Sequence, residues 1–155
     1  RELRAALDAH AAYADVELAV LLGERPAAAL DSVRRAAGVA SNNLEACLAR
    51  ALQEPRRSAR AGLEAVMVVD AALRRLAGRL SSFQHDPASA PDPAALAAWR
   101  DWLRLAFQSL AEGLALPPGQ PAHEPNGPTA RIARQIELMD GALRREDRLG
   151  QSRPL

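Results

Sequence analysis

The feature that most constrains the fold is an uninterrupted helical pattern between Pro26 and Pro55. Apolar residues recur there every three or four positions, the spacing that places them on one face of an α-helix. They are Leu30, Val33, Ala37, Ala40, Leu44, Cys47, Leu48 and Ala51. Because a single amphipathic helix cannot bury its own apolar face, the pattern predicts that other helices cover it.

The rest of the chain shows the same helical spacing of apolar residues. Segments with helical spacing are found at residues 2–22, 57–82, 93–116 and 129–147. Alanine and leucine dominate the hydrophobic residues while aromatic residues make up only 3% of the chain, a composition that favours helix over sheet. We therefore predict an all-α fold, an up-and-down antiparallel bundle of four to five helices, with residues 1–148 as one domain and 149–155 as a frayed tail.

Polar residues interrupt two of the apolar faces. His10, Tyr13 and Glu17 lie on or beside the apolar face of the first segment, and Asp70 lies within that of the third. Buried polar groups need hydrogen-bond partners, so these four are predicted to form a polar layer that sets the register of the bundle. Arg74, one turn beyond Asp70, is placed for an i,i+4 ion pair.

No motif in the sequence points to catalysis. The single cysteine, Cys47, lies on the inward face with no histidine at helical spacing, which predicts an inert thiol. A weak metal set of His10, Glu17 and Asp70 is conceivable, but a structural polar layer is the favoured interpretation. We expect no metal site, no cofactor and no enzymatic activity.

The fourth segment carries both tryptophans. Trp99 and Trp102 could stack a planar ligand, although the core and rim of a bundle are their more usual places. The inward face predicted for this helix consists of Leu96, Trp99, Leu103, Ala106, Leu110 and Leu114, with Trp102 and Phe107 at its edges.

The charge pattern argues against nucleic acid as a partner. All 20 basic residues are arginine and the net charge is +1, but the arginines alternate with acidic residues and form no basic patch. No apolar run approaches the roughly 18 residues of a membrane span, so direct membrane insertion by this segment is not expected.

The stretch from Arg34 to Pro55 resembles the C-terminal soluble domain of the fusaric-acid-resistance (FUSC) family, bacterial inner-membrane proteins that include efflux pumps for aromatic carboxylic acids. The residues that carry the resemblance are Arg34, Arg35, Gly38, Asn43, Glu45, Arg50, Glu54 and Pro55. HAAYADVEL before this stretch, ALRRLAGRL after it and RIARQIELMDGALRR near the end fit the same family in the same order.

The resemblance implies an accessory domain on the cytoplasmic face of the inner membrane, with an assembly or regulatory role. Its partner would be the transmembrane part of the same polypeptide, which would end just before Arg1, and a homo-oligomer is left open. In this interpretation Arg34, Asn43 and Glu45 fix the second helix against its neighbours or a partner subunit.

Two alternatives from other functional classes stay open. One is a free-standing interaction module that binds a partner helix in a groove. The other is a sensor that binds a small aromatic acid between its helices, which requires an arginine-lined pocket near Trp99 or Tyr13.

Overall fold

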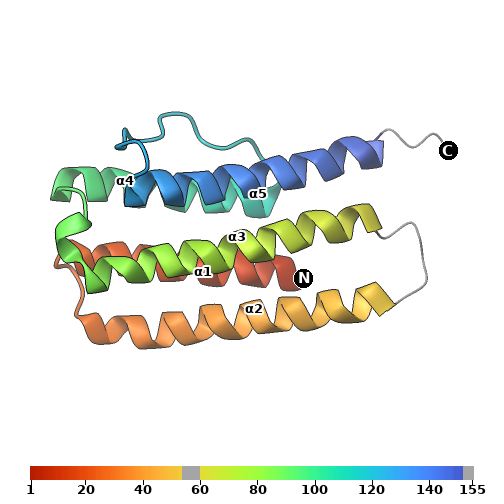
Figure 1. The fold of residues 1–155 in the computed structure, drawn as a ribbon, viewed down its shortest axis with the longest axis horizontal. Helices are drawn as coiled ribbons and strands as arrows, with labels where there is room; N and C mark the ends of the chain where they lie inside the picture. The colour runs from red at the N-terminus through yellow and green to blue at the C-terminus, as the bar shows by residue number, and fades with distance from the viewer. Residues whose placement is uncertain (54–59, 152–155) are drawn as a thin grey trace.

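The computed structural model describes residues 1–53 and 60–151, and the described residues form helices and turns without strands (Figure 1). This confirms the predicted all-α helical bundle. The α-helices are α1 (Glu2–Leu21), α2 (Leu30–Gln53), α3 (Arg60–His85), α4 (Pro93–Glu112) and α5 (Pro128–Gln151), with 3-10 turns η1 (Ala27–Ala29) and η3 (Pro87–Ser89).

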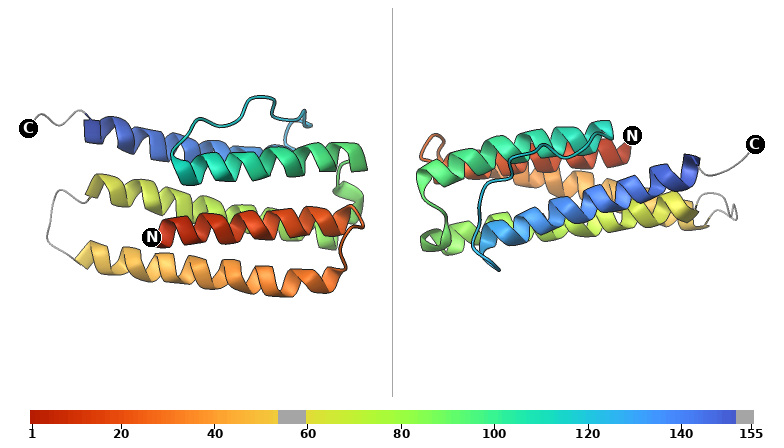
Figure 2. Two further views of the ribbon diagram at one scale, coloured as in Figure 1. Left: turned by 180° about the vertical axis from the view of Figure 1, so that it is seen from behind. Right: turned by 90° about the horizontal axis from the view of Figure 1, so that it is seen from above.

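Helix α1 occupies the centre of the arrangement. It packs against α2, α3 and α4, while α3 also packs against α2 and along α5. Successive helices alternate in direction from α1 to α4 (Figures 1 and 2). The connection 113–127 then crosses back along the bundle, so that α5 runs parallel to α4 and antiparallel to α3.

The crossover connection is attached to α4 by the two tryptophans. The indole Nε1 of Trp102 donates a hydrogen bond to the carbonyl oxygen of Pro117 at 3.2 Å. The ring of Trp99 meets that of His123 at a centroid distance of 5.9 Å and that of Trp102 at 5.6 Å, edge to face in both cases. Both indoles are buried, and Phe107, predicted at an edge, is buried as well. The tryptophans are thus core residues that hold the connection.

Local sequence signals explain how α4 begins and ends. The Oδ1 atom of Asp92 accepts a hydrogen bond from the backbone N–H of Ala95 at 3.0 Å, and Pro93 opens the first turn. Gly113 adopts a left-handed conformation with φ of 70° and ends the helix. The predicted continuation to residue 116 is therefore wrong, and Leu114, predicted to be inward, is 56% exposed.

Other boundaries shift by a few residues. Pro26 is extended and precedes η1, so α2 begins at Leu30 rather than at the proline. Helix α5 begins at Pro128 and ends at Gln151. The predicted end of the second helix at Glu54 and Pro55 lies outside the described residues.

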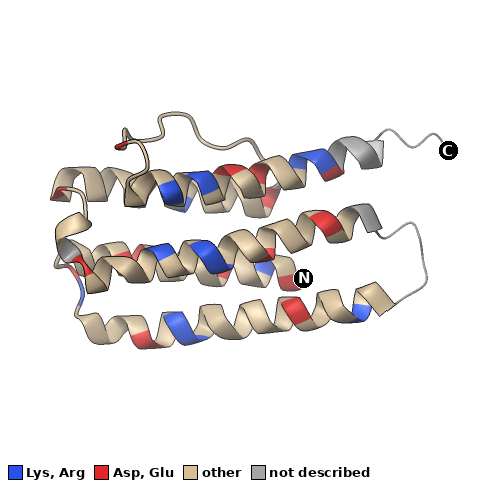
Figure 3. Cartoon of the chain, viewed as in Figure 1, with Lys and Arg blue, Asp and Glu red and all other residues tan. Residues whose placement is uncertain are grey.

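Charged residues of both signs alternate along the helices, as the sequence pattern indicated (Figure 3). Over the part of the chain that the structure describes, no helix combines the length and the apolar character that crossing a bilayer requires.

An ion-pair network joins α4 to α1. Arg100 binds both carboxylate oxygens of Asp15, with Nε–Oδ1 and Nη2–Oδ2 distances of 2.8 and 3.2 Å, and also pairs with Glu24. The hydrogen bond from Arg100 lowers the pKa of Asp15. The forked geometry makes this the best-formed charged contact between α1 and α4.

We predict that Arg100→Ala lowers the free energy of unfolding at pH 7 by about 1–3 kcal/mol, because it removes charge-assisted hydrogen bonds. Arg104→Ala, which removes an exposed pair with Asp101 inside α4, should cost less than about 0.5 kcal/mol. Urea unfolding of both variants measures the difference.

The Arg100 contribution should depend on pH. The folded-state pKa of Asp15 is depressed, so the stabilisation is present above the ordinary pKa of 3.8 and is lost as the pH falls below it. The deficit of Arg100→Ala should therefore shrink in acid. A deficit that is constant from pH 7 to pH 3 would contradict the assignment.

Candidate functional site: a polar groove between α2 and α3

A groove of about 510 Å³ lies between α2 and α3, above α1. Helix α1 supplies its floor with His10 and Tyr13. Arg34 and Arg74 stand on its two walls, which are otherwise built from Asn42 and small residues of α2 and α3. We refer to this feature as the α2–α3 groove.

The small wall residues recur at helical spacing on both helices. They are Ala37, Gly38 and Ser41 on α2 and Ala77, Gly78 and Ser81 on α3. A Cβ atom added at Gly38 or at Gly78 would meet nothing within 4 Å. A glycine at position 38 suggests a close helix approach there, but this interpretation is wrong because the glycine borders open space.

His10 lies in the floor with one ring nitrogen engaged. Its side chain is only 2% exposed, and Nδ1 lies 2.9 Å from the carbonyl oxygen of Ala6. Since a carbonyl can only accept, Nδ1 carries the proton and Nε2 of the neutral ring is an acceptor. Burial lowers the pKa of His10, so the neutral form persists at pH 7. Among the described residues, Nε2 has no hydrogen-bond partner.

Arg34 reaches from α2 to two buried groups of α1. Its Nε donates a long hydrogen bond of 3.4 Å to the phenol oxygen of Tyr13, and its Nη2 lies 3.5 Å from Oε2 of Glu17. The guanidinium carbon lies 5.8 Å from the centre of the Tyr13 ring. Arg34 therefore links α2 to α1, but none of these contacts is short.

Glu17 is completely buried beneath Arg34. Neither of its carboxylate oxygens accepts a hydrogen bond from the residues that the structure describes. Burial raises the pKa of Glu17, and the charge of Arg34 together with the nearby side chains of Gln84 and Tyr13 opposes that rise only in part. The same burial raises the pKa of Tyr13. Of the polar row formed by His10, Tyr13 and Glu17 on α1, Glu17 is the member whose burial is only partly offset by its neighbours.

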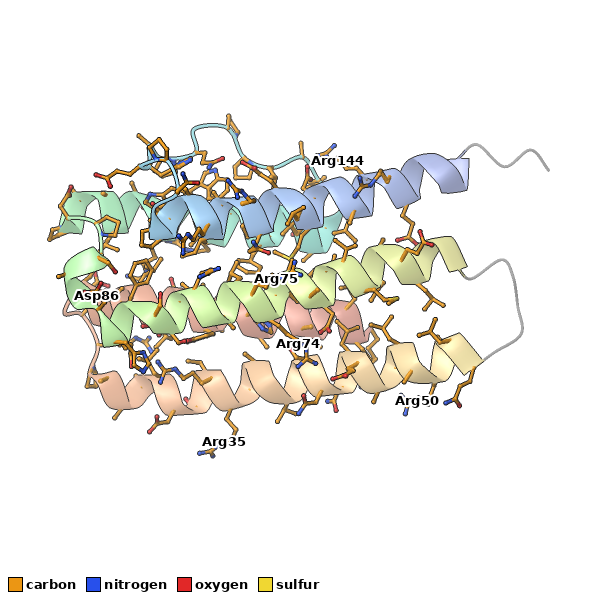
Figure 4. All side chains as sticks on the ribbon, in the orientation of Figure 1. Arg35, Arg50, Arg74, Arg75, Asp86 and Arg144 are labelled. Carbon is orange, nitrogen blue, oxygen red and sulfur yellow. The ribbon has the colours of Figure 1, made fainter. Side chains whose placement is uncertain are left out.

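Arg74 is bound much more fully at the other end of the groove. It pairs with Asp70 at 3.1 Å in the predicted i,i+4 arrangement, and with Glu45 of α2 at 2.8 Å. Its Nη2 also donates to the backbone oxygen of Ser41 at 3.3 Å. These bonds connect α3 to α2, and Figure 4 shows Arg74 directed into the space between the two helices. The Oδ1 atom of Asp70 is buried and has no hydrogen-bond partner in the described chain.

The remaining residues of the family-like stretch lie elsewhere. Arg35, Asn43 and Arg50 are exposed, and Figure 4 shows both arginines pointing away from α3. Asn43 makes no side-chain hydrogen bond within the described residues, so its predicted role in holding α2 would require a partner subunit. Cys47 is half-buried beside a separate apolar pocket of about 180 Å³. Glu54 and Pro55 lie outside the described residues.

The lining of the groove consists of hydrogen-bonding groups and small side chains. In the described parts of the chain, no three His, Cys, Asp or Glu side chains gather as metal ligands would. The groove offers an imidazole acceptor, a phenol, the hydroxyl of Ser41 and two guanidinium groups. Such a set binds and orients a small polar molecule.

Sequence reasoning missed Ser41 and Gly78 as groove residues. The available signal was the matching three- and four-residue spacing of small residues on two consecutive helices.

Compared with protein-family models, curated proteins and solved structures, the chain matches none of them.

We predict that Gly38→Ala and Gly78→Ala each raise the free energy of unfolding by about 0.5–1 kcal/mol. Glycine inside a helix costs about that much relative to alanine, and the added methyl group meets open space. Gly113→Ala is the matched control and should be destabilising, because its φ of 70° strains any residue with a Cβ atom. Losses at positions 38 and 78 would show that the groove is closed in solution.

A second prediction concerns Glu17. Its folded-state pKa is raised, so the folded protein binds more protons and the stability due to this group falls as the pH rises above about 4.5. Glu17→Gln removes that titration, and the stability difference, variant minus parent, should increase between pH 4 and pH 8. His10 titrates in both proteins, so its contribution largely cancels in the difference. A difference that decreases with pH would mean that the attraction to Arg34 outweighs burial.

Proposed function

We propose that this chain is a cytoplasmic accessory domain of a FUSC-type bacterial inner-membrane exporter, with an assembly or regulatory role and no catalysis of its own. The observation that carries the proposal is that some residues of the family-like stretch contact neighbouring helices while others are exposed on the opposite side of α2. Arg34 and Glu45 bind neighbouring helices, through Tyr13 and Glu17 on one side and Arg74 on the other.

The other face of α2 supports a partner-binding role. Arg35, Asn43 and Arg50 are exposed, together with the apolar side chain of Val39. A mixed polar and apolar helix face of this kind suits a modest protein interface. The membrane part of an exporter, or a second subunit, is the partner that the proposal assigns to it.

The test uses the full-length gene product in bacteria exposed to fusaric acid. The triple variant Arg35→Ala, Asn43→Ala, Arg50→Ala should lower resistance several-fold, because it alters the proposed interface. Its purified domain should unfold within about 0.5 kcal/mol of the parent, as expected for surface changes. Arg75→Ala, an exposed arginine on α3, is the matched control and should leave resistance unchanged.

Resistance that does not depend on the gene at all would refute the exporter proposal. Resistance that depends on the gene but not on the triple variant would place the interface elsewhere.

A second function, sensing of a small ligand between the helices, is favoured by one specific observation. The groove lies beside Tyr13 and is flanked by Arg34 and Arg74, which is the arginine-lined pocket that this alternative requires. Regulation of an exporter and sensing of a ligand are compatible roles for one domain.

A further inference from the structure

Three side chains in the α2–α3 groove have unused hydrogen-bonding capacity. His10 presents the free acceptor Nε2, and the hydroxyl of Ser41 has no hydrogen bond in the described chain although its side chain is only 3% exposed. Arg34 makes a single long hydrogen bond to a phenol. None of these atoms belongs to the fully enclosed polar atoms without a partner, so they remain accessible from the groove and specify what a bound molecule would offer.

The glycines provide an independent observation. Gly38 and Gly78 face the groove from opposite helices, have ordinary helical backbones and touch nothing where a Cβ would lie. Each costs roughly 1 kcal/mol relative to alanine without a packing gain in return. Gly141 of α5 also meets open space, but Gly38 and Gly78 differ from it because both line one groove, which their missing side chains keep open.

The charges around the groove decide where an anionic group can bind. Glu17 of α1, Arg34 and Glu45 of α2, and Asp70 and Arg74 of α3 are the charged groups that face it or contact its lining. Arg74 already binds two carboxylates and a carbonyl. Arg34 has only the distant carboxylate of Glu17, so it retains donors for the forked pairing that guanidinium makes with a carboxylate.

The floor sets the length of the ligand. His10 and Glu17 are seven residues apart on α1, which corresponds to about 10 Å along the helix axis, and Tyr13 lies between them. Arg34 stands over Tyr13 and Glu17. A molecule that spans from Arg34 to His10 therefore needs its two polar ends roughly 5–10 Å apart.

We propose that the α2–α3 groove binds a small carboxylate with a hydrogen-bond donor at its opposite end, the carboxylate pairing with Arg34 and the donor bonding to Nε2 of His10. This deepens the ligand-sensing function proposed above and rests on it.

The experiment is calorimetric titration of the purified protein at pH 7 with three probes. 4-Hydroxybenzoate has both polar ends, benzoate lacks the donor, and 4-hydroxybenzamide lacks the charge. We expect 4-hydroxybenzoate to bind at least tenfold more tightly than either analogue.

Variants separate binding from folding. Gly78→Leu fills the groove and should abolish binding, whereas Gly141→Leu on α5, where an added Cβ also meets open space, should leave it unchanged. Arg34→Gln should weaken both carboxylates at least tenfold, and His10→Phe should remove the preference for 4-hydroxybenzoate over benzoate. Thermal melts show whether each variant is folded.

Two results would overturn the proposal in different ways. Equal binding of all three probes would leave ligand sensing in place but refute the assigned chemistry. No binding of any probe at millimolar concentration, or undiminished binding by folded Gly78→Leu, would refute the groove as the site. The accessory-domain function is judged separately by the resistance assay.

Discussion

The structure depends on the burial of a polar row in its central helix. Because α1 is surrounded by α2, α3 and α4, the side chains of His10, Tyr13 and Glu17 are kept from water. A buried carboxylate or imidazole is costly unless another element supplies a partner. The bundle meets this constraint by placing the row beneath the seam between α2 and α3, where Arg34 reaches two of the three groups.

As a result of this constraint, the bundle contains two kinds of contact between helices. Around the groove, α1, α2 and α3 are joined by long arginine side chains, and small residues leave space between them. On the far side, α4 and α5 close the core with large side chains such as Trp99, Ile136 and Met139. The core cluster extends over all five helices, so the open groove between α2 and α3 does not interrupt it.

Periodicity in the sequence was sufficient to predict the helices and their inward faces, but not the distances between the helices. The apolar face predicted for α2 is buried or half-buried throughout, whereas Leu114 is exposed because Gly113 ends α4 one turn early. The pattern shows which residues share a face, but it carries neither the direction of α5 nor the distance between two faces. For that reason Gly38 suggested a close approach, and the groove it borders became evident only in three dimensions.

Several departures from the rules of good packing lie around the α2–α3 groove. Gly38 and Gly78 lower helix stability without packing more closely, Glu17 is buried without a hydrogen bond, and Arg34 stays too far from it to form one. For stability alone, alanine at both glycine positions and an uncharged residue at 17 would be better choices. Several of these departures meet at the α2–α3 groove, and binding at that groove is the role that we propose for them.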